Sequence, residues 1–226
     1  MKYSSLFLAA SLLVLPACQK SEITDKPAAQ VTESAGTTDT AADTALTANQ
    51  PADNAVTANV IKEKSSIDFV GAKVTRDHKG KFNSFDGTIE YVAGKPTRIA
   101  FEIDMNSIES DDAQLTGHLK SPDFFDVAKY PKATFVSTSL TEGAGGAGSP
   151  AGTTHLLRGT LDLHGVKKEV SIPVTATQNA DGVRAQSEFT INRHDWGVSY
   201  KGMADDLIKD NVLIRLDLAF PPPSSV

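Results

Sequence analysis

The chain has 226 residues and carries 28 Asp and Glu against 22 Lys and Arg, a formal net charge of -6 at pH 7. No block of basic residues interrupts this acidic balance, so nothing predicts attraction to the backbone of nucleic acid. The chain has a single cysteine, which excludes an intramolecular disulfide.

Residues 1–17 predict a secretory signal peptide. Lys2 supplies the positive end, and Leu6 to Leu15 supply an apolar run that is too short to span a bilayer. The run ends in Leu15-Pro16-Ala17-Cys18, which resembles a lipobox, the motif in which signal peptidase cuts before a cysteine that is then acylated. The alternative is an incidental cysteine in a discarded signal peptide.

Cys18 is therefore the expected lipid anchor, carrying palmitate or a similar acyl chain. Several acyl chains on one cysteine hold a protein stably at a membrane, whereas a single chain does not. Gln19, rather than Asp, follows the cysteine, which is typical of sorting to the outer membrane. We expect a membrane-anchored lipoprotein of the cell envelope, facing the periplasm.

Residues 18–59 are predicted to form a flexible linker. They are rich in Ala, Thr, Asp, Asn and Gln, and no aromatic residue occurs between Phe7 and Phe69. Such a segment buries too little apolar surface to offset the entropy lost on ordering. Its typical end-to-end distance as a coil is about 35 Å.

Residues 60–220 alternate between apolar and polar side chains with a period of two, which predicts strands with one buried face. Ile99, Phe101 and Ile103, for example, alternate with Ala100 and Glu102. Tight turns are expected at His164-Gly165, Asp181-Gly182 and Asp86-Gly87. A proline-rich tail, 221–226, ends the last strand.

One helical interruption is expected between about Asp111 and Ala128. Asp111 and Gln114 are the predicted capping pair. Ser121 and Pro122 suit the start of a second helical turn, and Tyr130-Pro131 ends it before a strand.

These elements predict an all-β fold, a single antiparallel barrel of about eight strands with a short helical insertion. Closure into a barrel leaves no exposed sheet edge. About eight strands enclose a space that is either filled by side chains or holds one small ligand. From composition alone, the filled core is favoured.

Several catalytic and metal sites are not supported. Gly143 to Gly148 matches GxGxxG, but no helix follows, so we interpret it as a hairpin loop. The five histidines show no metal-ligand spacing, and no metal or cofactor is expected. The acid pairs Asp111-Asp112 and Asp205-Asp206 suit solvated connections. We expect no enzyme, although a triad assembled from distant residues stays open.

A series of motifs carries a resemblance to a known family. In chain order they are Ser66-Ile-Asp-Phe69, Gly80 to Gly87, Gly117-His-Leu-Lys120, Ser121 to Phe135, Gly159 to Gly165 and Arg193-His-Asp-Trp-Gly197. Together they resemble the YceI-like family of lipocalin-type, polyisoprenoid-binding periplasmic proteins, over roughly Lys62 to Phe220. The resemblance implies an elongated cavity that holds a polyisoprenoid lipid, either an isoprenoid quinone or a prenyl diphosphate.

The resemblance and the alternation together give the expected ligand-binding residues. The apolar lining is predicted to comprise Phe69, Phe101, Ile103, Phe124, Phe125, Phe135, Leu161, Leu163, Ile172, Phe189, Ile191, Trp196, Ile214 and Leu216. Phe124 and Phe125 are expected to lie against one end of the barrel. For the headgroup, the candidates are Arg193, Arg76, His78 and His118.

Arg193 is favoured for the headgroup because Trp196 lies three residues on, where a cation and an aromatic ring could hold it together. An equally weighted alternative is that Arg193 binds backbone carbonyls and fixes the turn into Trp196-Gly197. Two other functions remain in view: a scavenger of assorted hydrophobic compounds and, less favoured, an isoprenoid-modifying enzyme. A homodimer is left open.

Overall fold

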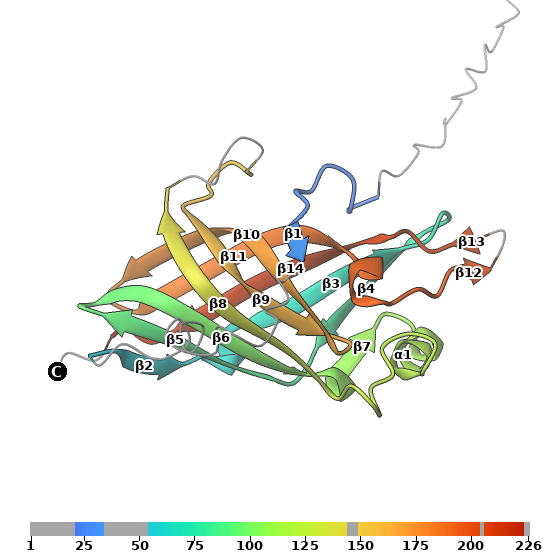
Figure 1. The fold of residues 1–226 in the computed structure, drawn as a ribbon, viewed down its shortest axis with the longest axis horizontal. Coiled ribbons are helices and arrows are strands. Elements are labelled where there is room, and N and C mark those ends of the chain that lie inside the picture. The colour runs from blue at the N-terminus through green and yellow to red at the C-terminus, as the bar shows by residue number, and fades with distance from the viewer. Residues whose placement is uncertain (1–20, 34–53, 144–148, 204–205, 224–226) are drawn as a thin grey trace, which may run out of the picture.

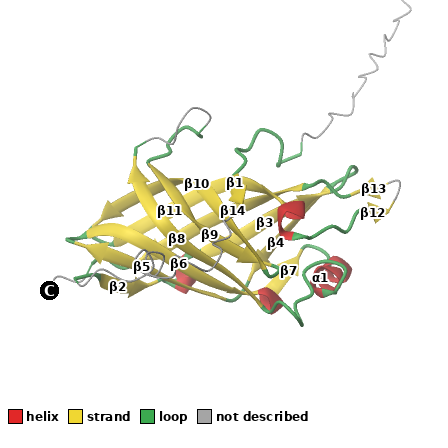
Figure 2. Cartoon of the chain, viewed as in Figure 1, coloured by secondary structure: helices red, strands yellow, loops and turns green. Residues whose placement is uncertain are grey.

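The structure is a computed structural model that describes residues 21–33, 54–143, 149–203 and 206–223. In this part of the chain, long strands curl around an elongated interior, and the helical segments lie at its margins (Figures 1 and 2). The strands are β1 Gln30–Glu33, β2 Val56–Asn59, β3 Ser66–Ala72, β4 Asp77–Phe82, β5 Phe85–Val92, β6 Lys95–Asp104, β7 Ile108–Ser110, β8 Lys132–Glu142, β9 His155–Leu163, β10 Val166–Asn179, β11 Gly182–Asn192, β12 Gly202–Met203, β13 Asp206–Leu207 and β14 Asn211–Phe220. The helical elements are α1 Ala113–Lys120 and the 3-10 turns η2 Lys62–Lys64, η3 Met105–Ser107 and η4 Arg193–Trp196.

One antiparallel sheet dominates the described residues. Its strand order is β2-β5-β6-β8-β9-β10-β11-β14-β3-β4-β7, with β1 added along β10. The curl is bridged after β2, where Val60 N–H donates to the Gly87 carbonyl of β5 and Ile61 N–H donates to the Ala219 carbonyl of β14, both at 2.8 Å. The predicted all-β, lipocalin-like antiparallel fold with a short helix is confirmed. The number of strands is higher than expected, because short strands join the long ones.

Alternation places the apolar faces inward, as the sequence predicts. In β6, Ile99 and Phe101 are buried while Glu102 is exposed. In β11, Ala185, Phe189 and Ile191 are buried while Arg184 and Gln186 are exposed. Because side chains point alternately to the two faces of a strand, each strand gives one row of apolar side chains to the interior.

One of the three predicted tight turns is present as predicted. His164 and Gly165 both have positive φ, 54° and 76°, as a two-residue hairpin turn requires. The turn predicted at Asp181-Gly182 is shifted by one residue to Ala180-Asp181, because Gly182 is the first residue of β11 and pairs with Asn179. The predicted turn at Asp86-Gly87 is wrong, because both residues lie within β5 and Gly87 pairs with Phe101 of β6.

The helical insertion is shorter than predicted and capped differently. The N-cap of α1 is Asp112, whose carboxylate accepts a hydrogen bond from Leu115 N–H at 2.9 Å. The predicted capping pair of Asp111 and Gln114 is wrong, because Asp111 instead binds His78. Ser121 ends α1 rather than starting a helix, and its hydroxyl donates to the His118 carbonyl at 2.7 Å. A series of turns follows, up to Tyr130.

Residues 21–33, here called the strap, dock on the barrel and add a strand to its wall. β1 pairs with β10 from Gln30 to Glu33, and Ala29 N–H donates to the Thr190 carbonyl at 2.8 Å. Ile23 is buried in a cluster with Val70, Ala72 and Leu213. The predicted flexible linker is therefore wrong for the strap and for β2.

Other predictions fall outside the described residues. These are the signal peptide, Cys18, the linker between residues 34 and 53, the glycine loop beyond Gly143 and the end of the tail. Within the residues that the structure describes, no helix is long and apolar enough to cross a membrane.

Candidate functional site

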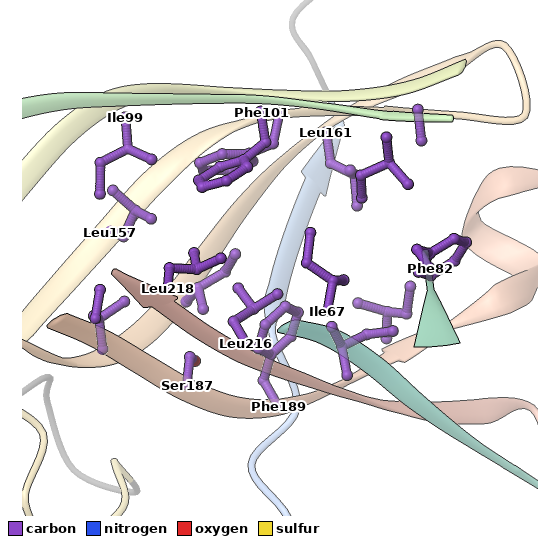
Figure 3. A pocket seen from close by; sticks show the side chains of 18 of the residues that line it. Ile67, Phe82, Ile99, Phe101, Leu157, Leu161, Ser187, Phe189, Leu216 and Leu218 are labelled. Atoms are coloured by element: carbon purple, nitrogen blue, oxygen red, sulfur yellow. The ribbon is translucent and has the colours of Figure 1, made fainter. Parts of the chain in front are cut away.

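The barrel interior contains an apolar cavity of about 130 Å³, here called the inner cavity. Aliphatic and aromatic side chains from β3, β4, β6, β8, β9, β10, β11 and β14 enclose it, and Figure 3 shows several of them pointing toward one another across the space. Polar atoms contribute little to its wall, because the hydroxyl of Ser187 donates to the Pro173 carbonyl at 2.6 Å. Its lining is Ile67, Phe82, Ile99, Phe101, Ile103, Met105, Ala133, Phe135, Leu157, Leu161, Leu163, Ile172, Val174, Ala185, Gln186, Ser187, Phe189, Ile191, Ile214, Leu216 and Leu218.

A second cavity of about 110 Å³, the end cavity, lies between the barrel and α1. Phe82, Leu163, Ile191 and Ile214 line both cavities, so the two spaces share one wall. The other residues of its lining are Phe69, Gly71, Ala72, Lys73, His78, Ile108, Leu115, Leu119, Phe124, Phe125, Arg193, Val198, Ile208 and Val212.

Three glycines keep phenylalanine rings flat against the wall of the barrel. A Cβ on Gly80 would lie 2.2 Å from the ring of Phe69, and one on Gly87 would lie 2.2 Å from the ring of Phe101. A Cβ on Gly159 would likewise lie 2.6 Å from the ring of Phe135. Without a side chain at these positions, each ring can occupy the space above the glycine rather than project into the cavity.

Sequence reasoning missed the part played by these glycines, and took Gly87 for a turn. The signal was present, because a glycine inside a strand often marks a close approach by another group. The group that approaches each glycine is identified by the cross-strand register. Phe69 pairs with Gly80, and Phe101 pairs with Gly87.

Most of the predicted apolar residues lie on the two cavities. The inner cavity contains Phe101, Ile103, Phe135, Leu161, Leu163, Ile172, Phe189, Ile191, Ile214 and Leu216, and the end cavity adds Phe69, Phe124 and Phe125. Trp196 lies outside both linings. It is fully buried, and its indole N–H donates to the Leu161 carbonyl at 3.3 Å.

Phe124 and Phe125 belong to an aromatic group that covers the end of the barrel. Phe124 is 6% exposed, and its ring centre lies 5.5 Å from that of Tyr200. His118 packs edge-on against Phe124 and Tyr200, with ring centres 5.2 and 4.6 Å away. His118 is therefore part of this packing and does not line either cavity.

Arg193 lines the end cavity, but its guanidinium group binds backbone carbonyls. Nη1 donates to the Val198 carbonyl at 2.7 Å, Nε to that of Lys209 at 3.2 Å and Nη2 to that of Ile208 at 3.4 Å. Burial lowers the pKa of Arg193, and the nearby Asp210 opposes that shift. This geometry favours the alternative in which Arg193 fixes the turn beside Trp196.

His78 lies between Arg76 and Asp111. Arg76 Nε donates to His78 Nε2 at 2.9 Å, which leaves His78 Nδ1 to donate to the Asp111 carboxylate, also at 2.9 Å. Burial acts to raise the pKa of Asp111, but hydrogen bonds from His78 and from Lys79 N–H bring it below its usual value. His78 is buried and lines the end cavity, whereas the side chain of Arg76 is 60% exposed.

The chemistry of both cavities is that of an apolar container. Lys73, His78 and Arg193 are the basic residues of the linings, and all three belong to the end cavity. Among the described residues, no group of three or more His, Cys, Asp or Glu side chains is placed to hold a metal ion. An apolar cavity of this kind can take up hydrocarbon.

The solved structures that resemble this one include the following two. BcnA from Burkholderia cenocepacia is 25% identical in sequence and has a TM-score of 0.61, over 70% of this chain and 98% of that one. A polyisoprenoid binding domain from Saccharophagus degradans, implicated in plant cell wall breakdown, has a TM-score of 0.58 over 74% of this chain and 98% of that one. Its sequence identity is 19%, so this second similarity shows a shared fold.

Sequence comparisons agree with the structural ones. A UPF0312 protein of Shewanella denitrificans is 34% identical over 149 residues, which are 62% of this chain and 71% of that protein. A UPF0312 protein of Pseudomonas putida is 34% identical over 144 residues, or 60% and 71% of the two chains. The sequence model of the YceI-like domain matches residues 58–220. Since this match spans well over half of the chain, the protein belongs to the YceI-like family.

Proposed function

We propose that the protein binds a polyisoprenoid lipid, with the prenyl chain in the inner cavity and the polar head toward the end cavity. The observation that carries the proposal is the pair of adjoining cavities with an almost wholly apolar lining. The family relationship supports it, as does the polyisoprenoid binding ascribed to the domain from Saccharophagus degradans. The basic residues Lys73 and His78 favour the end cavity for a quinone or diphosphate head.

The size of the cavities limits how the ligand enters. An engineered apolar cavity of about 150 Å³ binds benzene, so each cavity here suits a short hydrocarbon segment as it stands. A longer prenyl chain requires Phe82, Leu163, Ile191 and Ile214 to separate, because these side chains lie between the two spaces. None of the four is locked by a polar contact through its side chain.

Transfer energies favour a carrier that works at a membrane. A chain of about 40 carbons at about 0.8 kcal/mol per methylene gives on the order of 30 kcal/mol for transfer from water. Measured affinities saturate near about 18 to 21 kcal/mol, so release of such a chain into water would be extremely slow. A bilayer offers nearly the same apolar environment as the cavity, which makes exchange at its surface close to balanced.

For the same reason, we propose that the protein is an envelope lipoprotein, held at a membrane through acylated Cys18. The lipobox-like segment ending at Cys18 supports this proposal. Carriage or storage of the lipid, rather than its chemical conversion, is the activity that follows.

Organic extraction of protein purified from its own envelope, followed by mass spectrometry, tests the proposal. We expect to recover a prenyl lipid, in an amount no greater than equimolar with the protein. Ala185→Leu fills the inner cavity and should lower the yield several-fold, while Ala176→Leu, a core residue outside the lining, is the matched control. A mixture of unrelated hydrophobic compounds would favour the scavenger instead. Recovery of no amphiphile at all from the unaltered protein would contradict both.

A further inference from the structure

Two residues with exposed apolar side chains are neighbours at one end of the barrel. Among the described residues, Val74 and Leu207 are the large apolar residues that are exposed, at 68% and 48%. They are far apart in sequence, but Val74 N–H donates to the Leu207 carbonyl at 3.1 Å. We call this feature the tip and define it as residues 73–76, which join β3 to β4, together with 206–209. In Figure 1, both segments lie at the same end as α1.

Several basic residues lie near Val74 and Leu207 along the backbone. Lys209 is exposed and its N–H donates to the Ala72 carbonyl at 2.8 Å, while exposed Lys201 accepts a backbone hydrogen bond from Ile208. Lys73 bridges to Ile208 through its backbone, and the exposed Arg76 follows Val74 by two residues. Lysines have long aliphatic stems, so they can lie along apolar surface while the ammonium group reaches phosphate.

The acidic residues nearby are mostly engaged with other groups. Asp77 accepts hydrogen bonds from the Ser21 hydroxyl and from Glu22 N–H, both at 2.8 Å. Asp210 lies 2.8 Å from His194 Nε2, and Asp112 caps α1. The sequence of the tip contains one acidic residue, Asp206.

The strap begins beside the tip. Its contacts to Asp77 are joined by ion pairs from Glu22 to Lys79 at 2.6 Å and to Arg215 at 2.8 Å. Cys18 precedes Ser21 by three residues, which can span at most about 10 Å. An anchor on Cys18 would therefore hold this end of the barrel close to the membrane, instead of releasing it on a long tether.

The tip also borders the end cavity, because Gly71, Ala72, Lys73 and Ile208 line that cavity. We infer that the tip is a membrane-contact surface, which places Val74 and Leu207 among phospholipid head groups with the nearby lysines at the phosphates. An exposed apolar group flanked by basic residues is typical of proteins that lie in the membrane interface. Passage of a prenyl chain between the bilayer and the end cavity rests on the proposed function, whereas the contact itself does not.

Site-specific labelling tests this contact. The full chain is reconstituted into vesicles of phosphatidylethanolamine and phosphatidylglycerol after Val74→Cys or Leu207→Cys and attachment of an NBD fluorophore. Ala180→Cys is the matched control, because it is exposed in the turn at the opposite end of the β11 and β14 ladder. The parent chain, whose only cysteine is Cys18, is treated with the fluorophore in the same way. Its signal measures label that is not attached at the introduced cysteines. Nitroxide-labelled phospholipid should quench positions 74 and 207 several-fold more than position 180.

Equal quenching at all three positions would overturn the inference, and so would strong quenching only at position 180. Protection of positions 74 and 207 without lipid quenching would indicate a protein partner and would overturn it as well. A second variant, Val74→Asp with Leu207→Asp and a label at Lys209→Cys, should lose the quenching seen with the same label in the unaltered tip, with an unchanged unfolding midpoint. If no prenyl lipid is recovered while quenching at the tip persists, the proposed ligand fails and the membrane contact stands.

Discussion

At the scale of single residues, the glycines beneath the phenylalanine rings have the most direct effect on the cavity. Gly87→Ala places a methyl group 2.2 Å from the ring of Phe101, so the ring has to tilt into the inner cavity. Forcing extra atoms into a packed position typically costs about 1 to 3 kcal/mol. We expect the free energy of unfolding to fall by this amount, and the bound lipid to fall several-fold, as measured by urea denaturation and by extraction.

Gly117→Ala, in α1, is the control, because Gly117 lines neither cavity and a Cβ there meets no atom within 4 Å. It should leave lipid content unchanged. A Gly87→Ala variant with full lipid content would show that the position of the Phe101 ring does not limit the cavity.

Arg193 gives the second prediction at this scale. Arg193→Met removes donors from the carbonyls of Val198, Ile208 and Lys209 without removing the apolar stem. Leaving a buried polar group without a partner costs about 1 to 3 kcal/mol, so the total loss of stability should be at least about 3 kcal/mol. Thermal or urea unfolding measures it.

Arg193→Lys should recover little of that stability, because an ammonium group cannot reproduce the planar fork of donors. If Arg193 instead holds the ligand headgroup, Arg193→Met should lower the lipid content and leave the stability unchanged. A variant that remains stable yet loses lipid would show that Arg193 holds the ligand rather than the turn.

At the scale of elements, the strap depends on ion pairs with the barrel. Arg215 binds both Glu22 and Glu188 at 2.8 Å, and Lys26 also pairs with Glu188. Partly exposed pairs contribute only about 0.2 to 1 kcal/mol each, so Arg215→Gln should loosen the strap without unfolding the barrel. We expect a glutamate-specific protease to cleave after Glu22 several-fold faster, with an unchanged unfolding midpoint. Arg184→Gln, which removes another surface pair to Asp217, is the control and should not change cleavage after Glu22.

The same contacts make strap docking depend on pH. Hydrogen bonds from Lys79 and Arg215 lower the pKa of Glu22 below 4.5, and hydrogen bonds from Lys26 and Arg215 lower that of Glu188 against the opposing effect of burial. Because the carboxyl pKa is lower when the strap is docked, the ionised carboxylates stabilise docking at pH values above 4.5, the pKa of the undocked state. This stabilisation is lost as the pH falls through the pKa of the docked state. Hydrogen exchange of residues 22–32 should therefore stay slow from pH 7 to 5 and accelerate below about 4.5, after correction for intrinsic rates. In a variant with Glu22→Gln and Glu188→Gln, this pH dependence should be much weaker; an unchanged profile would contradict the assignment.

The strap also shows where sequence reasoning stops. The long strands could be predicted because rows such as Ile99, Phe101 and Ile103 repeat with a period of two, and this pattern reflects a local requirement of the sheet. The strap has no such pattern, since Ser21, Glu22 and Lys26 dock through partners 55 to 193 positions away. Asp112 displaced Asp111 as the cap of α1 for a similar reason, because Asp111 is held by His78 of a distant strand.

The residues that line the apolar site could be predicted from the sequence, but the shape of the site could not. Alternation gives the side chains that point inward, yet a filled core and a hollow barrel have the same pattern. Trp196 shows the difference, because it was predicted to line the cavity and instead fills the core with its indole N–H bound to Leu161. Whether an inward side chain fills space or borders it depends on neighbours such as Gly87, which only the cross-strand register identifies.

At the scale of the whole molecule, the inner cavity, the end cavity and the tip adjoin one another in that order. The inner cavity leads to the end cavity through their shared wall, and the tip borders the end cavity. The strap places the start of the described chain beside the tip. A lipid leaving the bilayer at the tip would therefore meet the basic residues of the end cavity first and the wholly apolar interior last.

This arrangement predicts that the stability conferred by the ligand depends on the presence of a membrane. A ligand at 100 times its dissociation constant stabilises the native state by about 2.7 kcal/mol. For a domain of this size, that shift raises Tm by roughly 5 to 10 °C relative to delipidated protein. Because a bilayer accepts a prenyl chain nearly as well as the cavity does, an excess of empty vesicles should remove most of this gain from loaded protein. Calorimetry with and without vesicles measures it, with delipidated protein plus vesicles as the control. If loaded protein keeps its full gain in Tm at equilibrium with excess vesicles, the cavity retains its ligand far more strongly than a bilayer does, and the protein stores the lipid rather than exchanging it.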